Sequence, residues 1–493
     1  MSERRGDQPN ILPNILMVMA DQMTPFMLDV CAGVGARMCN LQALAERGVN
    51  FANAYTPSPI CAPARAALMT GQYVSRTGCY DNGDPFPSYV PTFAHYLTNQ
   101  GYEVVLSGKM HFIGADQLHG FQRRLNTDLY PAGFIWSYPL LDENDPEAMA
   151  FDFAPQYQAQ NIGPGWPTEL QYDEETHFRA LEYLRHAPDK PFALVVSFTS
   201  PHPPYVVPKA YWDLYKDADL PLPHYPGGME ETYSELDRSF LRWYGLDRRS
   251  IRDPEHLQAM RRGFCALAHY VDNKLGELLA VLDETGLRGE TVVMFTADHG
   301  EMLGEKGLIQ KRSLYDWSTR IPMVVDHPGF NGGRSVDTPV SLIDLPATLL
   351  DIAGATSARP MDGRSLLPAL RGESLADVPV ISEYHAEGIM RPCFMVRKGP
   401  WKYIYIHRAP GQLFNLETDP GEWDNLSGRP EVAGIERELD AAVTGGDFDL
   451  DFIEKDVWDR LAQKEVVNQA MATNGTSWDY RVDTDPSQQY VRR

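Results

Sequence analysis

The sequence predicts an α/β fold whose central sheet is covered by helices on both faces. Short, nearly continuous apolar runs are typical of strands buried on both sides, and they alternate with longer segments in which apolar residues recur every three or four positions, as in helices. The predicted strands are 15–20, 103–107, 192–199, 291–297 and 321–325. The predicted helices are 40–48, 92–101, 173–186, 256–285 and 345–354. This alternation favours a largely parallel sheet with functional groups at the carboxyl ends of its strands.

Two stretches, 140–170 and 200–255, break the alternation, because they are rich in Pro, Gly, Tyr and Trp without a clear period. We expect long loops or insertions there, which are commonly functional inside a compact domain. After about residue 372 the pattern changes again. Short strands are predicted at 378–383, 390–397 and 401–407, followed by a turn-rich stretch at 412–426 and then helices. The sequence therefore predicts a large domain over 1–375 and a smaller α+β domain over 376–493.

Composition excludes some classes of function. The chain has 493 residues with 44 Lys and Arg against 67 Asp and Glu, a formal net charge of −23. Such a surface argues against non-specific binding of nucleic acid or anionic membranes. The 6 cysteines include no C-x-x-C pair, which argues against a disulfide scaffold or a structural zinc site. No apolar run approaches the ~20 residues that span a bilayer, and no apolar leader follows the N-terminus. We expect a soluble, cytoplasmic protein with reduced thiols.

Acidic residues stand directly at the ends of two predicted strands. Asp21-Gln22 follows the strand at 15–20, and Asp298-His299 follows the strand at 291–297. Each Asp alone would be interpreted as a cap or turn residue. Two strands that deliver oxygen and imidazole ligands to one sheet edge can instead chelate a divalent cation. Carboxylate and amide oxygens suit Ca²⁺ or Mg²⁺, whereas His favours Mn²⁺ or Zn²⁺.

A cysteine stands at the predicted start of another helix. Pro63 suits the first turn of a helix, and the following Ala, Arg, Leu and Met residues favour its continuation. Cys61 would then lie where backbone N–H groups and the helix dipole attract an anion and lower a thiol pKa. The alternative is a half-buried structural cysteine. From the residues alone, this is a suspected anion site.

The segment Cys61-Ala62-Pro63-Ala64-Arg65 resembles the C-x-P-x-R signature of the type I sulfatases, in the alkaline-phosphatase superfamily, and 69–72 resembles its second half. Further family motifs follow in order over about residues 12–425: Asp21-Gln22, 107–111, 201–203, Asp298-His299 and Lys311. The resemblance implies an alkaline-phosphatase-like large mixed sheet flanked by helices. It also implies that a formylglycine-generating enzyme oxidises Cys61 to formylglycine.

The resemblance assigns roles to individual residues. It implies a divalent metal, Ca²⁺ before Mn²⁺ or Mg²⁺, held by Asp21, Gln22, Cys61, Asp298 and His299. A formylglycine hydrate would offer one oxygen to attack sulfur and a second to expel sulfate. Arg65 would fix the hydrate, Lys109, His111 and Lys311 would hold sulfate oxygens, His202 would protonate or bind the bridging oxygen, and Asn82 would bind a further oxygen. The plain alternatives are a solvated Lys311 and a packed His111.

Several segments are most similar to bacterial choline sulfatases, namely 107–112, 116–121, 128–131, 382–387, 412–414 and 477–480. In that group, the positions of Trp136 and Glu387 supply an aromatic face and a carboxylate for a quaternary ammonium. The alternatives are a core aromatic and a surface charge. Ser200 stands where the group usually has His, and a longer acidic tail is not matched. Both departures weaken the choline prediction more than the sulfatase prediction.

Three functions therefore stay open. The first is hydrolysis of small sulfate monoesters, with choline sulfate or aryl and alkyl sulfates as substrates. The second is hydrolysis of phosphonate monoesters or phosphodiesters on the same scaffold. The third is a non-catalytic, anion-binding relative. Aromatic residues near the C-terminus predict a packing arm and a homo-oligomer: Trp458, Trp478, Tyr480 and Tyr490.

Overall fold

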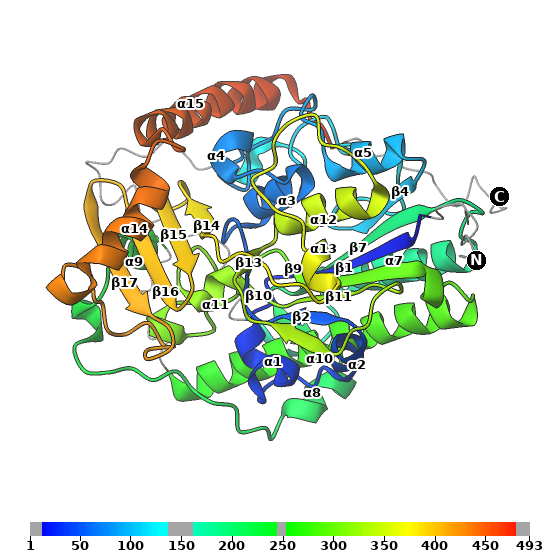
Figure 1. The fold of residues 1–493 in the computed structure, drawn as a ribbon, viewed down its shortest axis with the longest axis horizontal. Helices are drawn as coiled ribbons and strands as arrows, with labels where there is room; N and C mark the ends of the chain where they lie inside the picture. The colour runs from blue at the N-terminus through cyan, green and yellow to red at the C-terminus, as the bar shows by residue number, and fades with distance from the viewer. Residues whose placement is uncertain (1–11, 137–160, 244–252, 480–493) are drawn as a thin grey trace, which may run out of the picture.

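An eight-stranded mixed sheet lies at the centre of the protein (Figure 1). The computed structural model describes residues 12–136, 161–243 and 253–479. In spatial order the strands are β12 (Arg334–Val336), β2 (Val49–Phe51), β11 (Met323–Asp326), β9 (Thr291–Ala297), β1 (Asn14–Asp21), β7 (Phe192–Pro201), β4 (Glu103–Gly108) and β5 (Arg123–Arg124). Only β11 runs antiparallel to its two neighbours in this sheet. The large mixed sheet implied by the sequence is confirmed.

Helices cover both faces of this sheet, as its buried strands require (Figure 1). One face carries α2 (Cys39–Arg47), α7 (Thr168–Arg185), α8 (Lys209–Tyr215) and α10 (Pro254–Glu284). The other carries α3 (Cys61–Thr70), α5 (Phe93–Asn99) and α12 (Asp344–Ala353). Shorter helices are α1 (Asp29–Ala32), α4 (Val74–Thr77), α9 (Glu235–Trp243), α11 (Asp316–Thr319) and α13 (Leu367–Leu370). Single 3-10 turns are η1 (Pro25–Met27), η2 (Phe134–Trp136), η3 (Met229–Glu231), η5 (Arg288–Glu290), η6 (Glu305–Gly307) and η7 (Pro430–Val432).

The smaller sheets extend the structure away from the central one. Two of them are short, one formed by β10 (Arg320–Ile321), β3 (Ala54–Tyr55) and β13 (Val340–Ser341), the other by β6 (Ile162–Pro164) and β8 (Tyr205–Val207). A four-stranded antiparallel sheet consists of β14 (Val380–Tyr384), β15 (Cys393–Lys398), β16 (Trp401–Ile406) and β17 (Ala409–Asn415). It begins shortly after the predicted domain boundary at 375, which remains a prediction.

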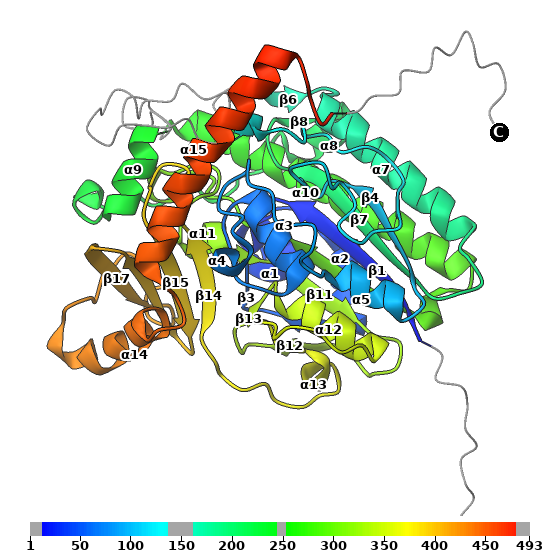
Figure 2. The same cartoon turned by 90° about the horizontal axis from the view of Figure 1, so that it is seen from above.

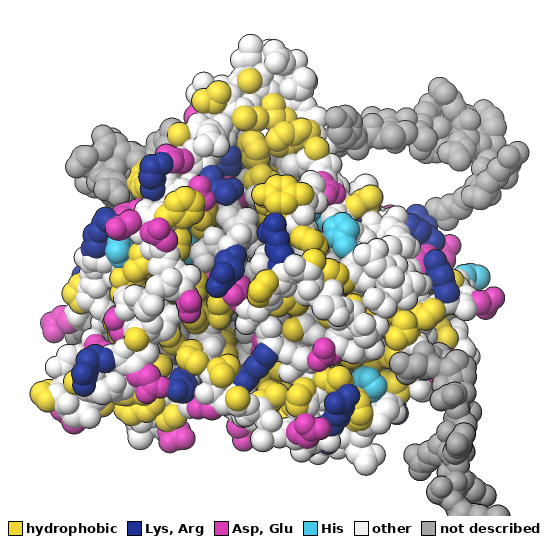
Figure 3. All heavy atoms as spheres, turned by 45° about the horizontal axis from the view of Figure 1, so that its top comes forward, with side chains coloured by type: hydrophobic (Ala, Val, Ile, Leu, Met, Phe, Trp, Pro, Cys, Tyr) yellow, Lys and Arg dark blue, Asp and Glu magenta, His cyan; other side chains and the backbone are white. Residues whose placement is uncertain are grey.

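Two helices follow this antiparallel sheet. Helix α14 (Ala433–Thr444) packs on β15 and β16. Helix α15 (Leu450–Asn474) runs from this sheet past α4 and α3 (Figure 2). Apolar side chains gather on the upward projection of the face shown in Figure 3, and α15 exposes Phe452, Val466 and Val467. No helix in the described ranges is both long and apolar enough to cross a membrane.

The predicted elements are confirmed with three differences. The predicted strand at 321–325 is divided between β10 and β11, because Pro322 has no N–H for a continuous ladder. The stretch 200–255, predicted to form long loops or insertions, also contains β8, α8 and α9. The turn-rich interpretation of 412–426 was wrong at its start, because Gln412–Asn415 pairs with β16. Pro410 and Gly411 are residues typical of turns, so the sequence pattern did not indicate this strand. Of 140–170, residues 140–160 lie outside the described ranges, and the rest forms β6 and the start of α7.

The strand register explains where the functional residues meet. Ala20 of β1 lies beside Ala297 of β9, and Asp21 lies beside Pro201 of β7. Gly108 of β4 lies beside Ser197 of β7. Four neighbouring parallel strands therefore end at one edge, where their following residues form a common site.

Candidate active site

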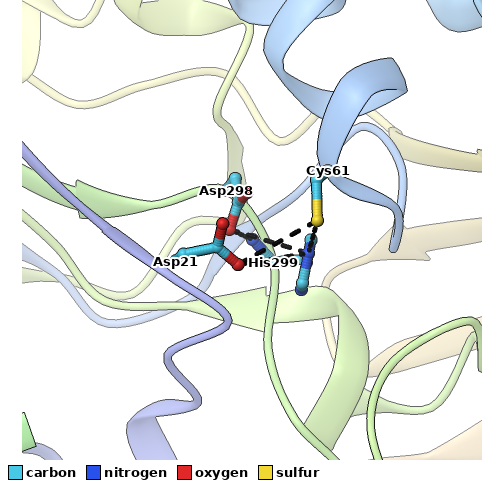
Figure 4. A group of neighbouring side chains, drawn as sticks. All are labelled: Asp21, Cys61, Asp298 and His299. Atoms are coloured by element: carbon cyan, nitrogen blue, oxygen red, sulfur yellow. Dashed lines mark hydrogen bonds and ion pairs between the residues drawn. The ribbon is translucent and has the colours of Figure 1, made fainter. Parts of the chain in front are cut away.

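Four side chains from three parts of the chain converge at this edge (Figure 4). Asp21 ends β1, Asp298 and His299 follow β9, and Cys61 is the first residue of α3. All four are buried, and one potential ligand atom from each lies within 4.8 Å of the others. Cys61 Sγ lies 3.2 Å from His299 Nε2 and 4.0 Å from Asp21 Oδ1. Two carboxylates, an imidazole and a sulfur this close together fit a divalent metal.

Arg65, one turn into α3, joins the two carboxylates. Its Nε donates to Asp298 Oδ2 at 2.9 Å, and its Nη2 donates to Asp21 Oδ2 at 3.2 Å. Its Nη1 donates to the Lys109 carbonyl at 2.6 Å and to Ser197 Oγ at 2.9 Å. Burial opposes the charge, but Asp298 and Asp21 hold the pKa of Arg65 above its usual range. Arg65 therefore keeps two buried acids apart and oriented.

Lys109 reaches the same acids from the end of β4. Gly108 before it has φ +106°, and a Cβ there would lie 2.0 Å from the Ser197 carbonyl oxygen. Only glycine allows this close turn against β7. Lys109 Nζ contacts Asp21 Oδ2. Burial lowers the pKa of Lys109, but Asp21 and Cys61 outweigh it and the pKa is raised. The lysine is a fixed positive charge beside residue 61.

Lys311 brings a second positive charge to the nucleophile. Its Nζ lies 3.2 Å from Cys61 Sγ and donates to Gln22 Oε1 at 2.5 Å. The Gln22 amide nitrogen in turn donates to Glu301, a buried carboxylate. Because the Gln22 side-chain oxygen accepts from a lysine, Gln22 orients Lys311 in this structure. Its role as a metal ligand stays a prediction.

The surrounding cations change the acidity of the thiol. Burial raises the pKa of Cys61, but Lys109, Lys311 and His299 together outweigh it and place the pKa well below its usual value. Burial likewise lowers the pKa of His299, but Asp298 and Cys61 raise it above the ordinary value. This environment stabilises negative charge at residue 61, whichever atom carries it.

The two other predicted histidines lie near this centre, His111 buried and His202 half-buried. His111 stacks on Tyr130 with ring centroids 4.6 Å apart, and its side chain hydrogen-bonds the Cys61 thiol. Burial lowers the pKa of His111. Burial and then Lys311 lower the pKa of His202 to about 3, and its Nδ1 lies 2.6 Å from the Pro203 carbonyl oxygen. Both imidazoles are therefore neutral near pH 7.

Asp173 of α7 fixes the segment that carries His202. It accepts from the Thr199 backbone N–H at 2.7 Å and from the Ser200 N–H at 2.9 Å. Ser200 is buried. The residue that departs from the choline-sulfatase pattern thus anchors the end of β7 through its backbone, one step before the cis peptide bond to Pro201.

Another side of the site, which we call the loop wall, is formed by Asn82, Arg312 and Glu387. Asn82 Oδ1 accepts from the Ala62 N–H at 3.0 Å and so caps the first turn of α3. The Asn82 N–H donates to Glu387 Oε1 at 2.8 Å, and Glu387 Oε2 accepts from Arg312 Nε. Glu387 is 2% exposed, so the interpretation as a surface charge was wrong. Trp136 meets Tyr130 edge to face at 6.0 Å.

Helix α15 holds this wall from behind. Lys464 Nζ lies 2.9 Å from Asp81 Oδ2 and 2.7 Å from Asp84 Oδ1, on either side of Asn82. The Tyr80 hydroxyl donates to Asp456 of the same helix at 3.0 Å. Asn82 is thereby connected to the last helix of the described chain.

Four residues at or behind the site were not predicted. Tyr130 contacts His111 and lies 4.2 Å from Lys109 Nζ, and it stood inside a segment already similar to the family. Glu301 follows Asp298-His299-Gly300 directly, and Arg312 follows Lys311. Both could have been found as sequence neighbours of predicted site residues. Lys464 had no such signal, because its partner Asp81 lies 383 positions away.

Buried strand-end acids, a nucleophile position at a helix start and fixed lysines define a metal-dependent hydrolase centre for an anionic ester. The family model described as "Sulfatase" matches residues 13–355, and "N-sulphoglucosamine sulphohydrolase, C-terminal" matches 304–446. The chain belongs to the sulfatase family, in the alkaline-phosphatase superfamily, and is a sulfuric ester hydrolase.

Individual relatives cover nearly the whole chain. It is 37% identical to a choline-sulfatase of Rhizobium meliloti (strain 1021), over 97% of this chain and 96% of that protein. It is 29% identical to an arylsulfatase of Clostridium perfringens (strain 13 / Type A), over 84% and 90%. Among solved structures, the phosphonate monoester hydrolase SpPMH from Silicibacter pomeroyi is 26% identical with a TM-score of 0.72, over 87% of this chain and 94% of that one.

Proposed function

We propose that the protein hydrolyses small sulfate monoesters with a formylglycine made from Cys61, on a divalent metal held by Asp21, Asp298, His299 and residue 61. The observation that carries the proposal is the position of Cys61, at a helix start and in contact with Lys311 and His299. Its Sγ stands where the oxygens of the hydrate would lie. The hydrate would supply the nucleophile, and the metal would lower its pKa and offset sulfate charge.

The chain's own residues provide binding and proton handling. Lys109 and Lys311 converge on residue 61 and would hold sulfate oxygens as charge develops. The His111 side chain hydrogen-bonds residue 61, so it would donate to a sulfate oxygen bound there. His202 would protonate or bind the bridging oxygen of the ester. Arg65 holds Asp21 and Asp298 in place, which agrees better with orienting the acids than with binding the hydrate directly.

A substrate panel tests the proposal. Wild-type protein carrying the aldehyde at 61, confirmed by the mass of that peptide, should cleave an aryl sulfate and an alkyl sulfate. Cys61→Ala should reduce kcat by about 10³-fold or more, because the nucleophile is lost. Cys265→Ala is the matched control, since Cys265 is equally buried but lies on α10. Full activity of Cys61→Ala would contradict the proposal.

The metal itself is a separate proposal. Calcium was favoured on the assumption that Gln22 supplies an oxygen, but the Gln22 oxygen accepts from Lys311. The metal would then be held by two carboxylates, one imidazole and residue 61, and because of the imidazole we propose Mn²⁺ in place of Ca²⁺. Adding Mn²⁺ to chelator-treated protein should raise Tm more than adding Ca²⁺ at the same concentration, because binding to the folded state alone stabilises it. Gln22→Ala should keep this rise. A larger rise with Ca²⁺, or its loss in Gln22→Ala, would restore the original prediction.

Phosphonate monoester hydrolysis is the second candidate. The likeness to the Silicibacter pomeroyi enzyme supports it. Phosphonate monoester hydrolysis would use the same nucleophile and the same metal as sulfate ester hydrolysis, so only a comparison of substrates distinguishes the two candidate functions. A phosphonate monoester cleaved with higher kcat/KM than every sulfate ester in the panel would favour this candidate.

Three further proposals concern the protein's surroundings. A formylglycine-generating enzyme would be the partner that modifies Cys61. A cytoplasmic location agrees with the unpaired cysteines of the described residues. A homo-oligomer is supported by the apolar side chains that α15 exposes, and light scattering would test it. Trp458 and Trp478 of the predicted packing arm lie in the described chain, whereas Tyr480 and Tyr490 lie outside it.

A further inference from the structure

A buried ion pair lines the loop wall beside residue 61. Arg312 Nε donates to Glu387 Oε2, and the Glu387 Oε1 atom accepts from the Asn82 N–H at 2.8 Å. Glu387 is 2% exposed and Arg312 is 6% exposed. Both oxygens of this carboxylate are therefore engaged by donors of the chain.

Two series of contacts connect this ion pair to residue 61. In one, Arg312 follows Lys311, whose Nζ is 3.2 Å from Cys61 Sγ. In the other, Glu387 binds Asn82, which caps the N–H of Ala62, the neighbour of Cys61. Arg312 and Glu387 both have positive φ, 77° and 65°. Non-glycine residues adopt this conformation seldom, so the backbone at both positions is in an uncommon conformation where the opposite charges meet.

The pair changes what the wall can recognise. A quaternary ammonium has no hydrogen to donate, so it is held by uncompensated negative charge and by aromatic faces. Arg312 compensates the charge of Glu387. Lys109 Nζ already lies 4.2 Å from the centre of the Tyr130 ring, and Lys311 adds another positive charge next to Arg312. A cationic leaving group would therefore meet a Glu387 carboxylate whose charge Arg312 already offsets.

We propose that Arg312 is a specificity-determining residue that directs the enzyme toward sulfate esters of uncharged alcohols and away from trimethylammonium esters. The inference rests on the proposed function. It differs from the choline prediction made from Trp136 and Glu387, because it depends on the partner that Glu387 has in this chain.

Two esters of equal shape test the proposal. Choline sulfate and 3,3-dimethylbutyl sulfate differ only in the positive charge, because carbon replaces nitrogen. The measured quantity is the ratio of kcat/KM for choline sulfate to kcat/KM for the neutral ester. We expect a ratio below one for wild type, and about a tenfold rise in Arg312→Met, equivalent to ~1.4 kcal/mol. Arg437→Met, which removes an exposed charge on α14, should leave the ratio unchanged.

Variants of Glu387 test the proposal without relying on Arg312→Met alone. In the double variant Arg312→Met/Glu387→Gln the ratio should fall back from the value in Arg312→Met. Glu387→Gln alone removes the carboxylate that Arg312 Nε binds and should lower the ratio below wild type. If Arg312→Met does not fold, as judged by Tm, this last variant decides. An unchanged or higher ratio in Glu387→Gln, or a wild-type ratio above ten, would overturn the proposal. If wild type cleaves neither sulfate ester, nor any aryl sulfate, the proposed function fails first and this inference fails with it.

Discussion

The two sides that we propose for this site, a nucleophile side and a leaving-group side, are built in different ways. On the nucleophile side, Asp21, Lys109 and Asp298 stand at the ends of strands in one sheet, and Arg65 binds both acids from the first turns of α3. On the leaving-group side, Asn82, Arg312 and Glu387 come from three loops and hold one another. The first side is fixed by sheet register, and the second by contacts between distant segments. Chemistry is therefore tied to the fold, whereas selectivity can change one loop at a time.

Arg65→Lys should give the largest effect, because it attacks the nucleophile side directly. Lysine cannot reproduce four hydrogen bonds in a planar fork, so Asp21 and Asp298 would lose their separation. We expect kcat/KM to fall by about 10²–10³-fold and the free energy of unfolding to fall by about 1–3 kcal/mol, because buried acceptors lose their hydrogen bonds while the positive charge is kept. Activity assays and thermal unfolding measure these, with Arg437→Lys as control. Near-wild-type values would show that strand register alone positions the acids.

Lys464→Met should give an intermediate effect, restricted to the leaving-group side. Asp81 and Asp84 would lose their shared cation, and the loop bearing Asn82 would loosen. We expect KM to rise by about tenfold, ~1.4 kcal/mol, with a smaller change in kcat. Lys455→Met, at an exposed position of the same helix, is the control. A loss confined to kcat would contradict the division between the two sides.

His177→Gln should give the smallest effect, on the scaffold under the nucleophile side. Burial, then Lys274 and Arg185, lowers the pKa of His177 from 6.5 to about 3. Because the folded-state pKa is depressed, the unfolded chain takes up the proton first, and stability is lost as pH falls below about 6.5. Between pH 7 and pH 5 the free energy of unfolding of the variant should decrease by about 1–2 kcal/mol less than that of wild type. Denaturant unfolding at both pH values measures this, and His186→Gln, at the exposed end of α7, should behave like wild type.

The same division explains how much the sequence could predict. Apolar runs followed at once by Asp21 and Asp298 identified both strands and their catalytic edge, because strand order and chemistry are local signals. The hydrogen bond from Gln22 to Glu301 and the one from Arg312 to Glu387 join residues 279 and 75 positions apart. No periodicity reports such a contact. A one-residue pattern could place Glu387 near a substrate, but it could not show that an arginine had already neutralised it.

The contact between α15 and the loop at 80–84 also concerns the order of events during synthesis. Cys61 is 2% exposed in the folded chain, so an enzyme that oxidises it would need the segment while it is still extended. The loop that caps α3 is secured by Lys464, which is synthesised about 400 residues after Cys61. The cysteine can therefore be reached while those residues are being added, before Lys464 binds the loop. Deleting α15 should prolong that period, at the expense of a less well-closed site.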